Sequence, residues 1–153
     1  MATEQAITIA GPAGLLEGRA SVGDGRAAFL MCHPHPLFDG PMNHKVVTSM
    51  VRTASRLGLS TLRFNFRGVG GSDGEHDQGQ GEQQDVLAAI RYARDILGWQ
   101  QLYLGGFSFG AGMACLAAQA QPDDISGLFL IAPAVHHFDA PSALPMQFET
   151  FVY

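Results

Sequence analysis

The sequence contains few charged residues, no cluster of basic residues and no long hydrophobic run. Charged side chains make up 15% of the 153 residues, and the formal net charge is −5. A nucleic-acid partner is not expected, because such partners require a basic surface. No apolar run approaches the roughly 18 residues that cross a membrane, so no membrane partner is expected either. The N-terminal segment carries Glu4 and no basic residue, which argues against a signal peptide.

Cysteine is also scarce. The two cysteines, Cys32 and Cys115, stand far apart in the chain, each within an apolar segment. This usage is typical of small buried hydrophobes in a reducing compartment, and not of a disulfide or a metal site. We therefore predict a cytoplasmic protein with no metal and no cofactor.

Hydrophobic residues are plentiful at 46%, and glycine is unusually abundant with 19 residues. This apolar content is sufficient for a core and excludes intrinsic disorder as the main description. The length is that of one domain, which we expect to span residues 1–153.

Short apolar runs that do not alternate with polar residues predict strands buried on both faces of a sheet. They cover residues 27–32, 59–66, 102–107 and 127–132, and each ends at a polar or proline-containing stretch. A hairpin is predicted before them at residues 5–22, and a last strand at residues 147–153.

Helical patterns fill the gaps, at residues 46–57, 86–97 and 109–120. Glu82 and Asp85 stand near the start of the second helix, where acidic residues are favoured by the helix dipole. The alternation of strands and helices predicts an α/β fold with a mostly parallel central sheet and helices on both faces.

Polar or proline-containing stretches follow the ends of the predicted strands. His33-Pro34-His35-Pro36 follows the first apolar run, Arg67-Gly68-Val69-Gly70 the second, Ser108 the third, and residues 133–139 the fourth. Ligand sites of open α/β sheets lie at the carboxyl ends of the strands. We therefore expect the functional site at this edge of the sheet.

The segment Gly106-Phe107-Ser108-Phe109-Gly110 matches the pattern G-x-S-x-G between a predicted strand and a predicted helix. In this context the pattern is typical of a nucleophile elbow, a strained turn that exposes a reactive serine. Glycines on either side allow strand and helix to approach closely. The alternative is an ordinary strand-to-helix turn; a phosphate-binding loop would need a different pattern.

An oxyanion hole requires two amide donors beside such a serine. The Phe109 amide is the first candidate, and the second is an amide of His35 or Leu37, since proline cannot donate. The imidazoles of His33 and His35 are expected only to hydrogen-bond loop carbonyls. Phe38 and Phe107 are candidates for lining an apolar pocket, although core packing explains aromatic residues equally well.

Three segments together resemble the α/β-hydrolase superfamily, in particular its small bacterial dienelactone-hydrolase-like and esterase-like branch. They are residues 32–47 (CHPHPLFDGPMNHKVV), 64–74 (FNFRGVGGSDG) and 105–114 (GGFSFGAGMA). The resemblance implies a three-layer α/β sandwich and a serine hydrolase acting on an ester or similar small acyl compound. Dienelactone hydrolases use a cysteine nucleophile, so Ser108 points to the esterase-like relatives.

The loop after Phe66 resembles the family's R-G-x-G-x-S segment and is predicted to be structural. Glycines allow a tight loop, and Arg67 is expected to pin it by hydrogen bonds. Residues 73–77, which include His76, are expected to form a solvated stretch of this loop.

The resemblance also implies an acid and then a histidine after the serine, and here the sequence departs from the family. The only histidines after Ser108 are His136 and His137, and none follows Asp139. We therefore expect these residues to be the N-terminal part of a longer hydrolase, without its last strand and helices. Two alternatives are a makeshift triad of Ser108, one of the two histidines and Asp139, and a non-catalytic binding domain. Otherwise His136 and His137 would line a pocket; the oligomeric state is left open.

Overall fold

The computed structural model describes residues 2–36, 41–133 and 149–153. They contain a sheet of seven strands in the order β1-β2-β4-β3-β5-β6-β7. The strands are β1 (Gln5–Gly11), β2 (Gly14–Ser21), β3 (Ala27–Cys32), β4 (Ser60–Phe64), β5 (Gln101–Phe107), β6 (Gly127–Ile131) and β7 (Glu149–Val152). The first two pair antiparallel and β2 pairs antiparallel with β4, whereas all pairs from β4 to β7 are parallel.

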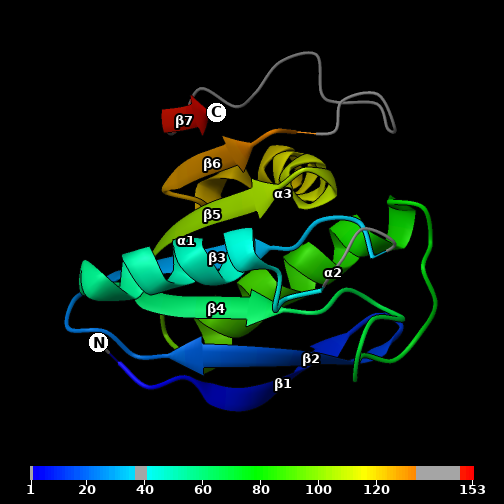
Figure 1. The fold of residues 1–153 in the computed structure, drawn as a ribbon, viewed down its shortest axis with the longest axis horizontal. Helices are drawn as coiled ribbons and strands as arrows, with labels where there is room; N and C mark the ends of the chain where they lie inside the picture. Colours follow the sequence, from blue (N-terminus) through cyan, green and yellow to red (C-terminus); the bar gives the residue numbers. More distant parts are fainter. Residues whose placement is uncertain (1, 37–40, 134–148) are drawn as a thin grey trace.

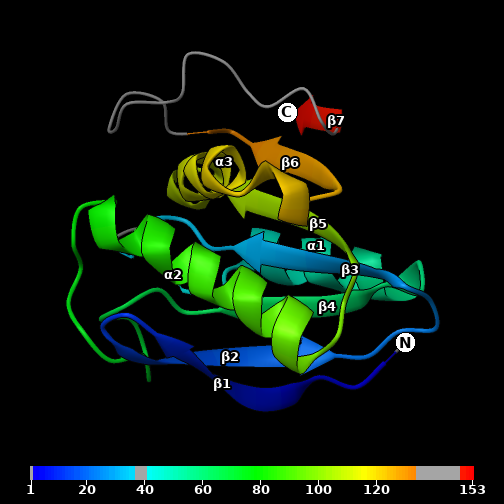
Figure 2. The same ribbon diagram turned by 180° about the vertical axis from the view of Figure 1, so that it is seen from behind.

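Helices cover both faces of the sheet. They are α1 (Lys45–Arg56), α2 (Gln80–Arg91), a π-helical turn that extends α2 (Tyr92–Ile96), and α3 (Phe109–Ala120), which is followed by a short 3-10 turn (Pro122–Asp124). Figure 1 shows α1 in front of the sheet, and Figure 2 shows α2 and α3 side by side on the opposite face. The predicted three-layer α/β architecture is therefore confirmed.

Each layer of helices has its own apolar cluster. The face under α1 holds Phe29, Met31, Val47, Val51 and Ala54, which we call the α1-side cluster. The other cluster, under α2 and α3, is larger and includes side chains from β3, β4, β5 and both helices. Each fully buried aliphatic side chain contributes about 1.5–3 kcal/mol, so the two clusters fix the helices against the sheet.

The helix termini follow the sequence with some differences. His44 caps α1 by accepting a hydrogen bond at Nδ1 from the Val46 amide, at 3.1 Å. The helix predicted at residues 86–97 begins earlier, at Gln80, and ends with the π-helical turn before Gly98, whose φ is 74°. None of the helices in the described parts of the chain is long and apolar enough to cross a membrane.

Two glycines allow a close backbone approach at the junction of β5 and α3. A Cβ atom placed on Gly106 would stand 2.3 Å from the Gly110 carbonyl oxygen. A Cβ atom on Gly110 would stand 2.4 Å from the carbonyl oxygens of Cys32 and His33, at the end of β3. The prediction of close packing at both glycines is confirmed, and Gly110 in addition packs against the end of β3.

These two glycines give a first test of the packing. We expect Gly106→Val and Gly110→Val each to lower the free energy of unfolding by roughly 3 kcal/mol or more, because the clashing atoms are backbone and cannot rotate away. Gly25→Val is the matched control, since a Cβ atom there meets nothing within 4 Å. Urea melts measure the three variants, and wild-type stability in Gly106→Val or Gly110→Val would contradict this packing.

Candidate active site

The polar segments predicted to meet at one edge of the sheet do so wherever the structure describes them. Strands β3, β4, β5 and β6 are parallel, so the residues after each of them gather at one end, on the right in Figure 1. The His35 ring lies 5.3 Å from the Phe109 ring, which brings the segment after β3 beside the start of α3. Leu37, Phe38, His136, His137 and Asp139 lie outside the described residues.

Ser108 stands between β5 and α3 in an unusual backbone conformation. Its φ is 56° and its ψ is −114°, a region that L residues other than glycine rarely occupy. Its amide donates to the Ile131 carbonyl at 2.9 Å, and its carbonyl accepts from the Ala111 amide at 3.1 Å. The surrounding structure therefore holds a strained residue in place, as is common at functional sites.

The start of α3 offers amide donors beside Ser108. The first amides of a helix have no acceptor within the helix, and the helix dipole favours negative charge at this end. Phe109 is the first residue of α3, and its own side chain is buried. The Phe109 amide is thus one of the amides at the N-terminus of α3 without an acceptor in the helix.

The aromatic residues on either side of Ser108 face opposite layers. Phe109 contacts Phe66 at 5.7 Å between ring centroids, and it also contacts the rings of His35 and His76. Phe107 is half-buried against the α1-side cluster, with the His44 ring at 5.3 Å. Both aromatic side chains therefore help to fix the turn from two sides.

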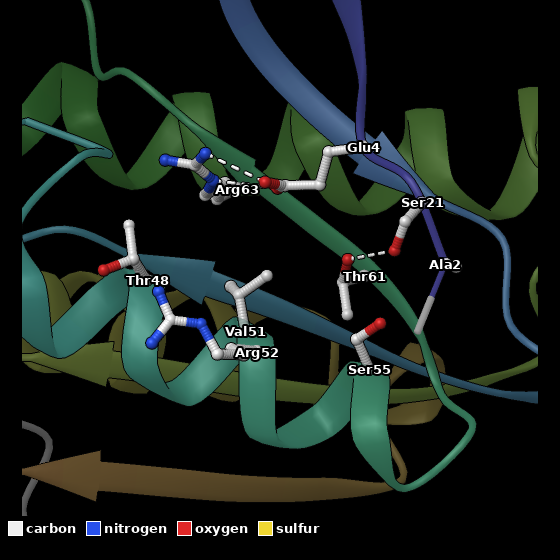
Figure 3. Close-up of a pocket in the computed structure, with 9 residues that line it drawn as sticks. All are labelled: Ala2, Glu4, Ser21, Thr48, Val51, Arg52, Ser55, Thr61 and Arg63. Carbon is white, nitrogen blue, oxygen red and sulfur yellow. Dashed lines mark hydrogen bonds and ion pairs between the residues drawn. The ribbon is translucent and has the colours of Figure 1, made fainter.

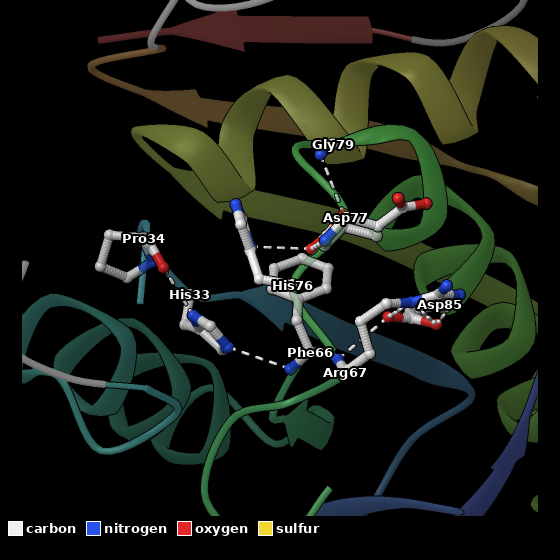
Figure 4. Close-up of polar contacts among 9 residues, drawn as sticks. His33, Pro34, Phe66, Arg67, His76, Asp77, Gly79 and Asp85 are labelled. Carbon is white, nitrogen blue, oxygen red and sulfur yellow. Dashed lines mark hydrogen bonds and ion pairs between the residues drawn. The ribbon is translucent and has the colours of Figure 1, made fainter. Parts of the chain in front are cut away.

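His33 is a buried structural histidine. Its Nε2 accepts from the Phe66 amide at 3.0 Å, so Nδ1 carries the proton and donates to the Pro34 carbonyl at 2.6 Å (Figure 4). Burial lowers the pKa of His33 to about 4. The neutral imidazole thus links the end of β3 to the residues after β4. The expected bond to a loop carbonyl is confirmed, and the second bond was not predicted.

Arg67 anchors the loop that follows β4, as predicted. Its Nη2 donates to Asp85 Oδ1 at 2.8 Å, and its Nε and main-chain amide both donate to Asp85 Oδ2 at 3.0 Å (Figure 4). Asp85 has a fully buried side chain. The helix dipole therefore explains the position of Asp85 in α2 only in part, because its main partner is Arg67 in the loop after β4.

The stretch expected to be solvated is also tied down at several points. Asp73 Oδ2 accepts from the Leu15 amide at 2.8 Å. His76 Nδ1 lies 2.9 Å from Glu82 Oε2, and Glu82 is fully buried at the start of α2. Residues 73–77 are all exposed, so the expectation of a solvated stretch is confirmed, and these contacts to other elements are an additional finding.

The sequence analysis missed a second buried ionic group near this edge. Arg63 in β4 donates from Nε to Glu4 Oε2 at 2.9 Å and from Nη1 to the Met42 carbonyl at 2.7 Å. The guanidinium lowers the pKa of Glu4 through a hydrogen bond. Figure 3 shows the pair in a pocket of about 270 Å³ between α1 and the strands. An arginine inside an otherwise buried strand was the available signal.

The described residues contain no group of three or more histidine, cysteine or acidic side chains that could hold a metal ion. Both cysteines are free and buried. Burial raises the pKa of both thiols, that of Cys115 to about 11. Neither thiol is therefore a nucleophile at neutral pH.

The chain is similar to known proteins over most of its length. The family described as alpha/beta hydrolase fold matches residues 28–153. An uncharacterised protein of Rickettsia prowazekii (strain Madrid E) is 37% identical over 148 residues, which cover 93% of this chain and 62% of that protein. The chain thus spans less than two thirds of the length of this relative.

Two solved structures are similar over nearly the whole chain. An alpha-beta serine hydrolase homologue from Coxiella burnetii is 37% identical with a TM-score of 0.89, covering 99% of this chain and 73% of that one. A protein from Xanthomonas campestris, described as an a/b serine hydrolase without a lid, is 34% identical with a TM-score of 0.86. That match covers 97% of this chain and 70% of the other.

His33 gives a test of the site's pH dependence. Its pKa is about 4 in the folded state and about 6.5 when unfolded, so the unfolded chain takes up the proton first. We expect the free energy of unfolding to be unaffected by this group above pH 6.5 and to fall by about 3 kcal/mol between pH 7 and pH 4. His33→Gln should lack this pH-dependent loss of stability. Urea melts at a series of pH values measure it, and the same dependence of the unfolding free energy on pH in the variant and the wild type would contradict the contribution of His33.

Proposed function

The chain belongs to the alpha/beta hydrolase family, and from this we propose that Ser108 is the nucleophile of a serine hydrolase acting on an ester or related small acyl compound. The observation that carries the proposal is the strained backbone of Ser108, with φ at 56°, directly before α3. Such a strained backbone is typical of a turn that holds a serine hydroxyl exposed at the end of a strand.

The geometry supports a role for each part of the turn. Ser108 Oγ attacks the acyl carbon, and the carbonyl oxygen becomes negatively charged. The Phe109 amide stabilises that charge, together with an amide of His35 or Leu37. The similarity to proteins described as serine hydrolases is in keeping with this assignment.

The general base and its orienting acid complete the proposal. His136 and His137 are the only histidines after Ser108 in the sequence. The relatives are longer than this chain, which covers 62% of one and 73% of another. We assign both missing groups to residues beyond Tyr153. The acidic net charge and the two reduced cysteines favour a cytoplasmic small-molecule enzyme with no nucleic-acid partner.

The nucleophile is tested by covalent labelling. We expect a fluorophosphonate probe to react with Ser108 in the complete protein, because an activated serine attacks phosphorus as it attacks an acyl carbon. Ser108→Ala should lose the label completely, whereas Ser49→Ala, which changes an exposed serine of α1, should keep it. Equal labelling of Ser108→Ala and wild type, measured by mass spectrometry, would remove Ser108 from the mechanism and favour a binding domain.

The location of the base is tested by the turnover of residues 1–153 alone. We expect only trace hydrolysis of p-nitrophenyl acetate, of the order of the ~10³–10⁴-fold over water that an oxyanion hole and binding can supply without a triad. His136→Ala and His137→Ala should not change it. A rate of ~1–10³ s⁻¹ that either substitution abolishes would instead establish the makeshift triad.

A further inference from the structure

A carboxylate–imidazole pair lies at the same edge of the sheet as Ser108 and has no part in the proposed chemistry. Glu82, the third residue of α2, is fully buried and accepts the Gly79 amide at Oε1 at 2.9 Å. Its Oε2 accepts the Asp77 amide at 2.8 Å and meets His76 Nδ1 at 2.9 Å. Both carboxylate oxygens are thus occupied, and the carboxylate cannot turn away from the imidazole.

This anchoring fixes the orientation of the His76 ring. Because Nδ1 lies 2.9 Å from the buried carboxylate, the ring presents its other nitrogen, Nε2, away from Glu82. No described residue forms a hydrogen bond with Nε2. The His76 side chain is 32% exposed, so Nε2 is accessible to a small molecule.

His76 is also next to the groups assigned to oxyanion binding. Its ring centroid lies 4.7 Å from that of His35 and 5.9 Å from that of Phe109. Phe109 directly follows Ser108 in the chain. The imidazole is thus in ring contact with the residue whose amide is assigned to the oxyanion hole.

We propose that His76 is a substrate-contacting residue, and that it selects acyl compounds with a free hydroxyl group close to the scissile bond. This inference rests on the proposed function, because it takes Ser108 as the point where the substrate binds. It adds to that function a chemical class of substrate and the residue that recognises it.

The chemistry of Nε2 explains why the recognised group is a hydroxyl. A hydroxyl can donate to the neutral imidazole and accept from the imidazolium, so the contact survives in both protonation states. A substrate carboxylate would approach Glu75 and Asp77, the exposed acidic neighbours of His76, and would be repelled. An ammonium group would lose its partner whenever the imidazole is protonated.

The test compares two fluorophosphonates that differ in one group, a 4-hydroxybutyl or a pentyl chain on the alkoxy oxygen. Labelling of Ser108 measures recognition without requiring turnover. We expect the hydroxyl probe to label the wild type roughly twofold to tenfold faster, which is the range of one hydrogen bond that is partly exposed. His76→Phe keeps the ring contacts and removes both nitrogens, and in this variant the two rates should become equal.

Two comparisons separate this selectivity from a loss of structure. Urea melts should show that His76→Phe is folded, and His44→Asn, which keeps a capping side chain on α1, should retain wild-type selectivity. The same hydroxyl preference in His76→Phe as in wild type would overturn the inference alone. Failure of both probes to label Ser108 would overturn the proposed function, and this inference with it.

Discussion

The contact between Gly106, Gly110 and the end of β3 is the constraint on which this structure depends. Three backbone segments approach here so closely that no side chain fits between them. Because α3 begins at this point, its amides come to lie at the carboxyl ends of the parallel strands. The strained conformation of Ser108 follows, since the chain must leave β5 and enter α3 within a single residue.

Buried charges hold the loops around this contact. Asp85 binds the side chain and main-chain amide of Arg67, and Glu82 binds two amides and an imidazole. A carboxylate buried in this way is stable only while its hydrogen bonds are complete, so each loop has one preferred arrangement. The segment between β4 and α2 is therefore held at several points by buried carboxylates.

Much of this fold could be predicted from the sequence, because its elements depend on local patterns. The apolar run at residues 27–32 coincides with β3, and the helix expected at residues 109–120 coincides with α3. At the candidate site, the strained turn at Ser108 could be predicted because a sequence motif marks it. The hydrogen bond from Arg63 to Glu4 joins residues 59 positions apart, and the one from Phe66 to His33 joins residues 33 positions apart. No local sequence pattern indicates either bond.

The backbone conformation of Ser108 depends on contacts between residues that are far apart in the sequence. Its amide bonds to Ile131 in β6, and the helix that follows it rests against Cys32 and His33 after β3. Closing such long loops is slow compared with forming a hairpin such as β1–β2, whose strands pair locally. The strained turn at Ser108 is therefore expected to form after the hairpin, once β3, β5 and β6 have come together.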